Sequence, residues 1–256
     1  MAFDIAVFLV LPLAIVIVVT ILAGRRARAR SEDYDSDSVS FVGGVLNALF
    51  TVVLAFFVVF AWQTGADLDG HATTEADAVI DTYWQLAAVP QPDADRIRAL
   101  LTRYATQVAD REWPALTEGR DAPEVTETIT ELRSAVTALP VDAEIVAEAR
   151  KQALQNIRTI DENHRARVEM ATSDDAFTIA LLIGTVVGAV LMLVFPLVFG
   201  MSTRPANIAV MALLALTLSA TLYVCWQLMN PLEGFFGTTP DAFRSALDEM
   251  TAPPNT

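Results

Sequence analysis

Four long windows without a charged residue constrain this sequence more than any other feature. They cover residues 5–24, 41–62, 176–200 and 206–230 and are 20, 22, 25 and 25 residues long. Because an α-helix rises 1.5 Å per residue, each window can cross the roughly 30 Å hydrocarbon core of a bilayer. The strands of a membrane β-barrel are about ten residues long and alternate in hydrophobicity, unlike these windows. The sequence therefore predicts an all-α integral membrane protein with four transmembrane helices.

Most of the charge of the chain lies between the second and third windows. Residues 63–175 hold 22 acidic and 11 basic side chains, a net charge of −11 within a chain of net charge −14. Apolar residues recur there at spacings of three and four in four stretches that prolines separate, which is typical of amphipathic helices. We expect an acidic soluble insert of four helices between two transmembrane hairpins, 1–62 and 176–232, followed by a tail, 233–256.

Arginines beside the spans predict the orientation of the chain. The loop 25–40 begins with four arginines and the short loop 201–205 holds another, whereas no basic residue precedes the first span. Short loops rich in Lys and Arg are usually cytoplasmic, so we expect both loops on the cytoplasmic side of the membrane. The insert and both termini are then expected outside the cytoplasm. Arginine outnumbers lysine 16 to 1, as in GC-rich bacteria, which favours a bacterial plasma membrane.

Motifs of the common enzyme classes are missing from the sequence. It has no phosphate-binding loop, dinucleotide fingerprint, zinc-protease motif or nucleophile elbow. Cys225 is the single cysteine, and His71 and His164 are far apart, so we expect no metal site and no cofactor. The acidic charge argues against a nucleic-acid partner. We therefore predict a protein that is not an enzyme and whose partners are membrane lipids and other proteins.

The second span carries the residues expected to line a pore. Asn47 and Thr51 are polar, and three phenylalanines follow at Phe56, Phe57 and Phe60. Polar residues within spans usually bond neighbouring helices, and phenylalanines usually face lipid or core. The alternative is a phenylalanine constriction that gates a pore by dewetting.

Small residues at four-residue spacing occur on two spans. Gly184 and Gly188 follow Ala180 in the third span, and Gly44, Ala48, Thr51 and Ala55 line one side of the second. Such faces allow helix backbones to approach closely in lipid. They predict helix packing either within one chain or between subunits.

A series of residues resembles the bestrophin-like domain proteins of bacteria, a family of four-span membrane proteins. They are Phe41, Val42, Gly43, Gly44, Asn47, Trp62, Glu75, Tyr104, the triplet Glu112-Trp113-Pro114, Arg165, Arg167, Pro231 and Gly234. The resemblance implies a relation to bestrophins, pentameric anion channels with a phenylalanine-bearing neck on the second span. It implies a homo-oligomeric channel whose pore the second span lines. Bestrophins keep their helical domain in the cytosol, whereas the arginines here place the insert outside.

Three charged residues near the membrane ends form a further candidate site. Glu75 lies shortly after the second span, and Arg165 and Arg167 lie shortly before the third. With a rise of 1.5 Å per residue they can meet at a similar height above the bilayer. We expect an ion pair that stabilises the bundle or, alternatively, a charged ring around a vestibule. For Glu112-Trp113-Pro114 we expect a helix terminus, with the indole in the core or at the membrane interface.

Two functions are consistent with these features. The first is an oligomeric ion channel of bestrophin-like type; because the insert of charge −11 would repel chloride and concentrate cations, its selectivity stays open. The alternative is a non-catalytic membrane scaffold or sensor whose acidic helical ectodomain binds an envelope protein. Fold alone does not decide between them.

Overall fold

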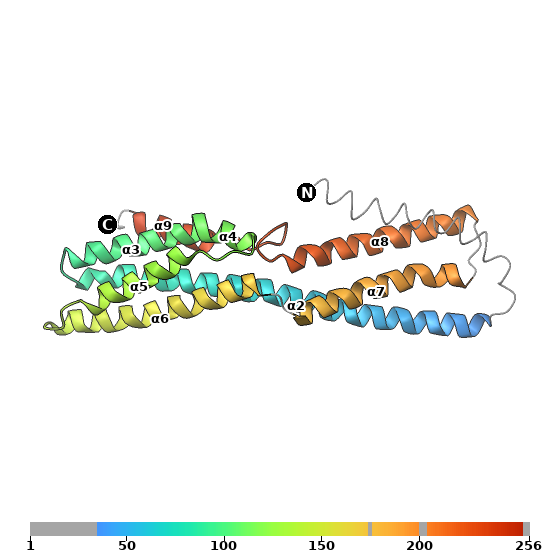
Figure 1. The fold of residues 1–256 in the computed structure, drawn as a ribbon, viewed down its shortest axis with the longest axis horizontal. Helices are drawn as coiled ribbons and strands as arrows, with labels where there is room; N and C mark the ends of the chain where they lie inside the picture. The colour runs from blue at the N-terminus through green and yellow to red at the C-terminus, as the bar shows by residue number, and fades with distance from the viewer. Residues whose placement is uncertain (1–34, 174–175, 200–203, 253–256) are drawn as a thin grey trace. The chain divides into compact units, whose positions relative to one another are not determined.

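The computed structural model describes residues 35–173, 176–199 and 204–252, and these residues are helical apart from the connecting turns. The first predicted span, 5–24, lies outside the described residues. The chain divides into two compact units (Figure 1). One, which we call the membrane unit, comprises Met1–Trp62 and Asp174–Asn230; the other, the bundle unit, comprises Gln63–Ser173 and Pro231–Thr256.

Three helical stretches of the described chain are long and apolar enough to cross a membrane. They are Asp37–Ala88, Glu144–Val198 and Pro205–Met229. The corresponding helices are α2 (Ser36–Gln85), α7 (Ala176–Val198) and α8 (Pro205–Met229). As far as the structure describes them, the apolar windows predicted at 41–62, 176–200 and 206–230 fall within these stretches, except that Phe199 and Asn230 lie one residue beyond their ends.

Glycines of α7 allow it to pack closely on α2 within one protomer. A Cβ atom added to Gly188 would lie 2.6 Å from Cδ2 of Phe50, and one added to Gly184 would lie 3.3 Å from Cγ1 of Val53. Without a hydrophobic force between helices in lipid, such close contacts provide the dispersion attraction that holds spans together. The small-residue face of α7 is therefore used inside the protomer.

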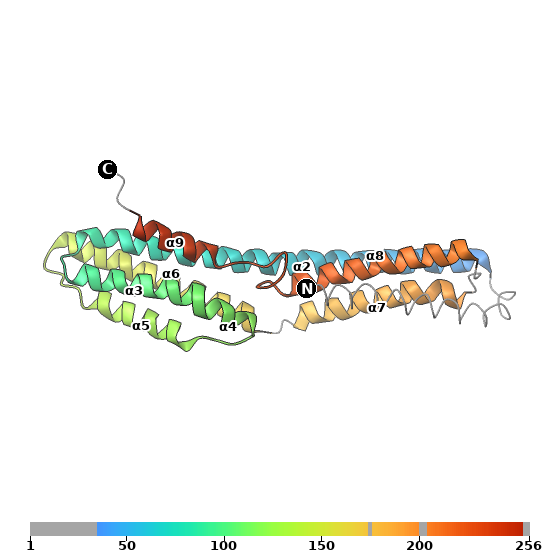
Figure 2. The ribbon, with the colours of Figure 1, turned by 90° about the horizontal axis from the view of Figure 1, so that it is seen from above.

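The bundle unit is built around one hydrophobic core. Its helices are the second part of α2, α3 (Asp93–Gln107), α4 (Trp113–Thr117), α5 (Pro123–Thr137), α6 (Glu144–Thr172) and α9 (Asp241–Thr251), with short helical turns η1 (Leu86–Ala88) and η2 (Val108–Glu112). Most apolar positions of the stripes predicted from the sequence face this core, and Leu101, Ile129 and Ile157 are fully or almost fully buried. Trp84 and Ile145, which the predicted stripes also include, are exposed instead. α3 packs against both α5 and α9 (Figure 1, Figure 2).

The helix α9 shows that the segment after the fourth span is more than a tail. Phe243, Ala246 and Met250 repeat at spacings of three and four and are buried in the core of the bundle unit. Asp241 lies in the first turn of α9, where its negative charge interacts favourably with the positive end of the helix dipole. The C-terminal segment thus contributes a further helix to the bundle.

Candidate functional site

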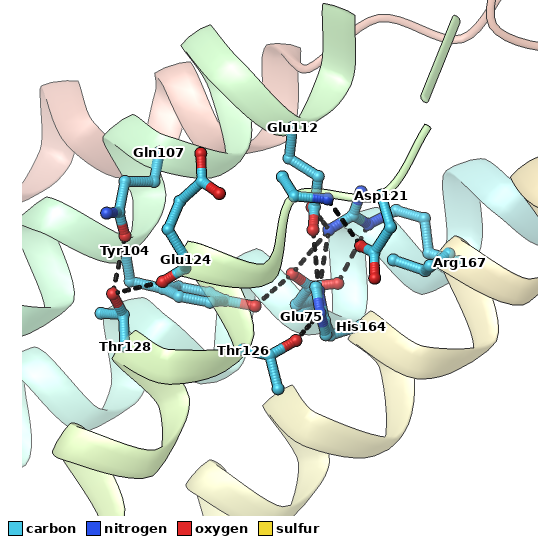
Figure 3. A network of polar contacts seen from close by, with 12 residues as sticks. Glu75, Tyr104, Gln107, Glu112, Asp121, Glu124, Thr126, Thr128, His164 and Arg167 are labelled. Atoms are coloured by element: carbon cyan, nitrogen blue, oxygen red, sulfur yellow. Dashed lines mark hydrogen bonds and ion pairs between the residues drawn. The ribbon is translucent and has the colours of Figure 1, made fainter. Parts of the chain in front are cut away.

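Three charged side chains lie in the core of the bundle unit without contact to solvent. Glu75 on α2, Glu112 at the end of η2 and Arg167 on α6 are each 0% exposed (Figure 3). Removing a charge from water costs several kcal/mol unless good partners replace the water. The geometry of the partners therefore decides whether this site is stable.

Arg167 binds both carboxylates at once. Its Nε lies 3.2 Å from Oε2 of Glu75, and its Nη2 lies 3.1 Å from Oε1 of Glu75 and 2.5 Å from Oε2 of Glu112. The guanidinium carbon lies 5.2 Å from the ring centre of Trp113 and 5.5 Å from that of Phe243, which are cation–π distances. Nη1 has no hydrogen-bond partner among the described residues. Charge-assisted bonds and aromatic faces together replace the water that this arginine has lost.

Tyr104 of α3 completes the surroundings of Glu75. Its hydroxyl group donates a hydrogen bond of 2.6 Å to Oε1 of Glu75. Burial, followed by the nearby Glu75 carboxylate, raises the pKa of Tyr104 well above its usual value. The phenol therefore remains a donor throughout the physiological range, and Glu75 is held from α3 and α6 together.

Glu112 and His164 form the titratable side of the network. Nδ1 of His164 lies 3.4 Å from Oε1 of Glu112, and Nε2 lies 3.3 Å from the Thr126 hydroxyl oxygen. Burial raises the pKa of Glu112 to about 7, although the charge of Arg167 acts to lower it. Burial also lowers the pKa of His164. At neutral pH the imidazole is therefore uncharged, and Glu112 is divided between its two protonation states.

A π-helical turn brings Glu112 into the core. Each residue of an α-helix turns by about 100°, so a regular helix would place Glu112 about 80° around the axis from Tyr104. The turn η2 (Val108–Glu112) is π-helical and takes up one additional residue. As a result Tyr104, Val108 and Glu112 are all buried. π turns of this kind often occur at functional sites.

Of the predicted charged residues, the structure brings Glu75 and Arg167 together but not Arg165. The Arg165 side chain is 72% exposed and pairs with Asp161, four residues earlier on α6, at 2.9 Å. Sequence reasoning missed the pairing of Arg167 with Glu112. Residue spacing provided no signal for it, because a regular helix would turn Glu112 away from the side that carries Tyr104.

The residues that follow Glu112 hold the C-terminal segment. Trp113 is buried, and its Nε1 donates a hydrogen bond of 3.2 Å to the carbonyl oxygen of Thr238. Pro114 lies in the first turn of α4, where a proline needs no hydrogen-bond partner for its nitrogen. The helical path therefore continues through the triplet to Thr117 instead of ending there.

Comparison with known proteins places the chain in a family. A family model described as the bestrophin-like domain matches residues 7–243. The chain belongs to the bestrophin-like domain family. Its structure is similar to the crystal structure of a bacterial bestrophin homologue from Klebsiella pneumoniae, with a TM-score of 0.73 and 12% sequence identity. The similarity covers 95% of this chain and 99% of the Klebsiella chain, and at this identity it shows a shared fold. No curated protein matches the sequence.

In this bestrophin-like protein the polar residues of the second span lie on an uncovered side of α2. Asn47 and Thr51 are exposed in the protomer, and the Thr51 hydroxyl group donates to the carbonyl oxygen of Asn47 at 2.9 Å. A Cβ atom added to Gly44 on the same side would meet no atom of the described residues within 4 Å. Among the described residues, nothing covers this side of α2.

The three phenylalanines of α2 do not share one environment. Phe57 is fully buried with Ala61 and Cys225, between α2 and α8. Phe56 is 54% exposed, and the ring of Phe60 makes an edge contact with Phe177 of α7, with ring centres 5.0 Å apart. Phe56 is thus the one of the three with the greatest exposed fraction.

The structure shows no centre for a metal ion in the part of the chain that it describes. Residues 35–173, 176–199 and 204–252 contain no group of three or more His, Cys, Asp or Glu side chains that could hold one. His71 is hydrogen-bonded through Nδ1 to Oδ1 of Asn163 at 2.8 Å.

Proposed function

We propose that this bestrophin-like protein is an oligomeric ion channel whose pore is lined by α2 within the membrane unit. The observation that carries this proposal is the uncovered small and polar side of α2. Membership in the bestrophin-like family and the fold shared with a bacterial bestrophin homologue support it.

The uncovered side of α2 has the composition of a helix contact or a pore wall. Gly44, Ala48, Thr51 and Ala55 repeat every three or four residues and so form one stripe, with Asn47 beside it. Phe50 and Phe57 lie on the opposite side and are buried against α7 and α8. Lipid favours large apolar side chains, whereas small and polar residues favour another helix or water. We therefore assign the stripe to subunit contacts around a pore, with Phe56, the most exposed of the three phenylalanines, as the candidate constriction.

The buried charge network has a positioning role in this proposal. Glu75, Glu112 and Arg167 have no exposed surface, so they cannot form a charged ring that a permeating ion would touch. Their bonds instead tie α2, α3, η2 and α6 together. Arg165 is exposed and remains available to a vestibule. We propose that the bundle lies outside the cytoplasm, as the arginine count predicts.

Conduction and the identity of the pore wall can be tested together. Purified protein in planar bilayers is expected to give unitary currents. With Cys225 replaced by alanine, Thr51→Cys should let a charged, water-soluble thiol reagent block these currents. Leu213→Cys on α8 is the matched control, because Leu213 is 65% exposed in the protomer but lies off the proposed pore wall. Absence of currents in an intact oligomer would reject the channel, and equal effects at both positions would reject α2 as the pore wall.

A further inference from the structure

The segment that joins α8 to α9 forms a closed loop with a defined shape. The amide of Thr238 donates a hydrogen bond of 2.7 Å to the carbonyl oxygen of Pro231. Gly234 has a φ of +85°, and a Cβ atom on Gly237 would lie 2.8 Å from the backbone of Glu233, so both positions require glycine. The Trp113 indole holds the base of the loop through the Thr238 carbonyl oxygen.

Two phenylalanines at the tip of this loop are left without cover. Phe235 is 80% exposed, more than any other large apolar residue in the described chain, and Phe236 is 45% exposed. Their rings meet edge to face with centres 5.1 Å apart. Leaving a phenylalanine in water forgoes the free energy gained by burying its ring. A rigid loop that presents an aromatic pair to solvent indicates a surface for an apolar partner.

The position of the loop in the chain identifies that partner. α8 ends at Met229, directly before the loop, and Pro231 lies 4.0 Å from a Cβ atom placed on Gly65. Gly65 follows Trp62, the last residue of the second apolar window, by three residues. Three residues of helix rise about 4.5 Å. The polar interface on each side of a bilayer is about 5 to 8 Å thick. The base of the loop therefore lies at the level of the lipid head groups.

We propose that Phe235 and Phe236 insert into the interfacial layer of the membrane that α8 crosses. Aromatic side chains are enriched at this level, and the exposed Trp62 and Trp226 near the ends of their spans fit the same layer. Glu233 is the only charged residue between Pro231 and Thr238, so the interaction depends on aromatic burial and not on anionic lipid. The proposal requires only that the spans cross a membrane, and it holds whether or not the protein conducts ions.

The depth of the loop tip can be measured in the full-length protein. Phe235→Cys, with Cys225 replaced by alanine, is labelled with an environment-sensitive fluorophore and reconstituted into nanodiscs. The matched control is Val141→Cys, an exposed apolar residue in the turn between α5 and α6. Circular dichroism verifies that both variants are folded. A second label at Phe236→Cys provides an independent reading.

The proposal expects a blue-shifted emission from position 235 and loss of its intensity when the lipids are brominated high on the acyl chain. The label at position 141 should show neither change. Equal behaviour of the two labels would overturn the proposal. A blue shift without quenching by brominated lipid would also overturn it, because a neighbouring subunit would then cover the tip.

Discussion

The guanidinium of Arg167 lies 2.5 Å from the carboxylate of Glu112, 55 residues away in the sequence, and both side chains are fully buried. Glu75 binds the same guanidinium from α2. One permanent positive charge thus forms ion pairs with two carboxyl groups. The stability of the bundle unit therefore depends on this arginine and on the proton of Glu112.

Replacing Arg167 with methionine should strongly destabilise the protein. Arg167→Met leaves Glu75 and Glu112 buried without a cation, and breaking a buried pair in this way costs about 3 to 5 kcal/mol. Arg165→Met is the matched control, because an exposed ion pair contributes about 0 to 1 kcal/mol. Denaturation of the purified protein in detergent, followed by circular dichroism, measures both. Equal losses for the two variants would contradict the structural role of the network.

Glu112 should make the stability of the protein depend on pH. Its pKa rises from 4.5 to about 7 on folding, mainly because of burial, so the folded state holds the proton more tightly than the unfolded chain. The resulting stabilisation is fully present below pH 4.5 and is lost as the pH rises through 7. It amounts to a few kcal/mol, on the order of 1.4 for each pKa unit.

The variant Glu112→Gln separates this effect from other titrating groups. Glutamine resembles the protonated carboxyl group and does not titrate. The free energy of unfolding of the variant, relative to that of the wild type, should therefore increase between pH 4.5 and pH 8. His164 acts in the opposite direction, because its lowered pKa removes stability as the pH falls through 6.5. When His164 contributes equally to the stability of both proteins, the difference between their free energies of unfolding reports the titration of Glu112 alone. A stability difference between Glu112→Gln and the wild type that stays constant across this pH range would exclude the raised pKa.

Two glycines at membrane depth should respond differently to substitution. Gly188→Ala forces a methyl group against the ring of Phe50, so we expect lower thermal stability of the protomer. A Cβ atom at Gly44 meets no atom of the described residues, so for Gly44→Leu we expect the fold to survive while the proposed subunit contact is blocked. Circular dichroism with analytical ultracentrifugation in detergent distinguishes these effects. If Gly44→Leu leaves the oligomeric state unchanged, the stripe does not lie at the subunit interface.

Cysteine labelling in whole cells should reveal the orientation. With Cys225 replaced by alanine, an impermeant thiol reagent should label Asp93→Cys at the start of α3 and leave Ser38→Cys unlabelled. Both positions are exposed in the structure, so access to the reagent depends on the side of the membrane. Labelling of Ser38→Cys alone would place the bundle in the cytoplasm.

The sequence predicts the helices of this protein well because their signals are local. Uncharged windows mark the spans, and the apolar spacing around Leu101 and Ile129 marks the sides that face the core. The function of the small-residue faces could not be predicted in this way. Gly44 and Gly188 both lie among small and apolar neighbours in sequence. A Cβ atom on Gly44 would meet no atom of the described residues, whereas one on Gly188 would meet the ring of Phe50. Such a difference depends on how helices far apart in sequence come together.

The buried network was only partly predictable for the same reason. The expected meeting of Glu75 with an arginine rested on their similar distances from the membrane ends. Spacing alone could not choose between Arg165 and Arg167, nor could it anticipate the π turn that brings in Glu112. The role of α9 was missed because its apolar spacing covers only 11 residues.

The one additional residue in the π turn Val108–Glu112 determines that the Glu112 side chain faces the core. A π turn is equivalent to one residue inserted into a regular helix. Winding the same residues as a regular α-helix, without the π turn, would turn the carboxylate at its end about 80° away from the side that carries Tyr104. Arg167 would then keep one anion instead of two, and the core would lose its neutral-pH proton. In this protein, helix winding governs acid–base chemistry.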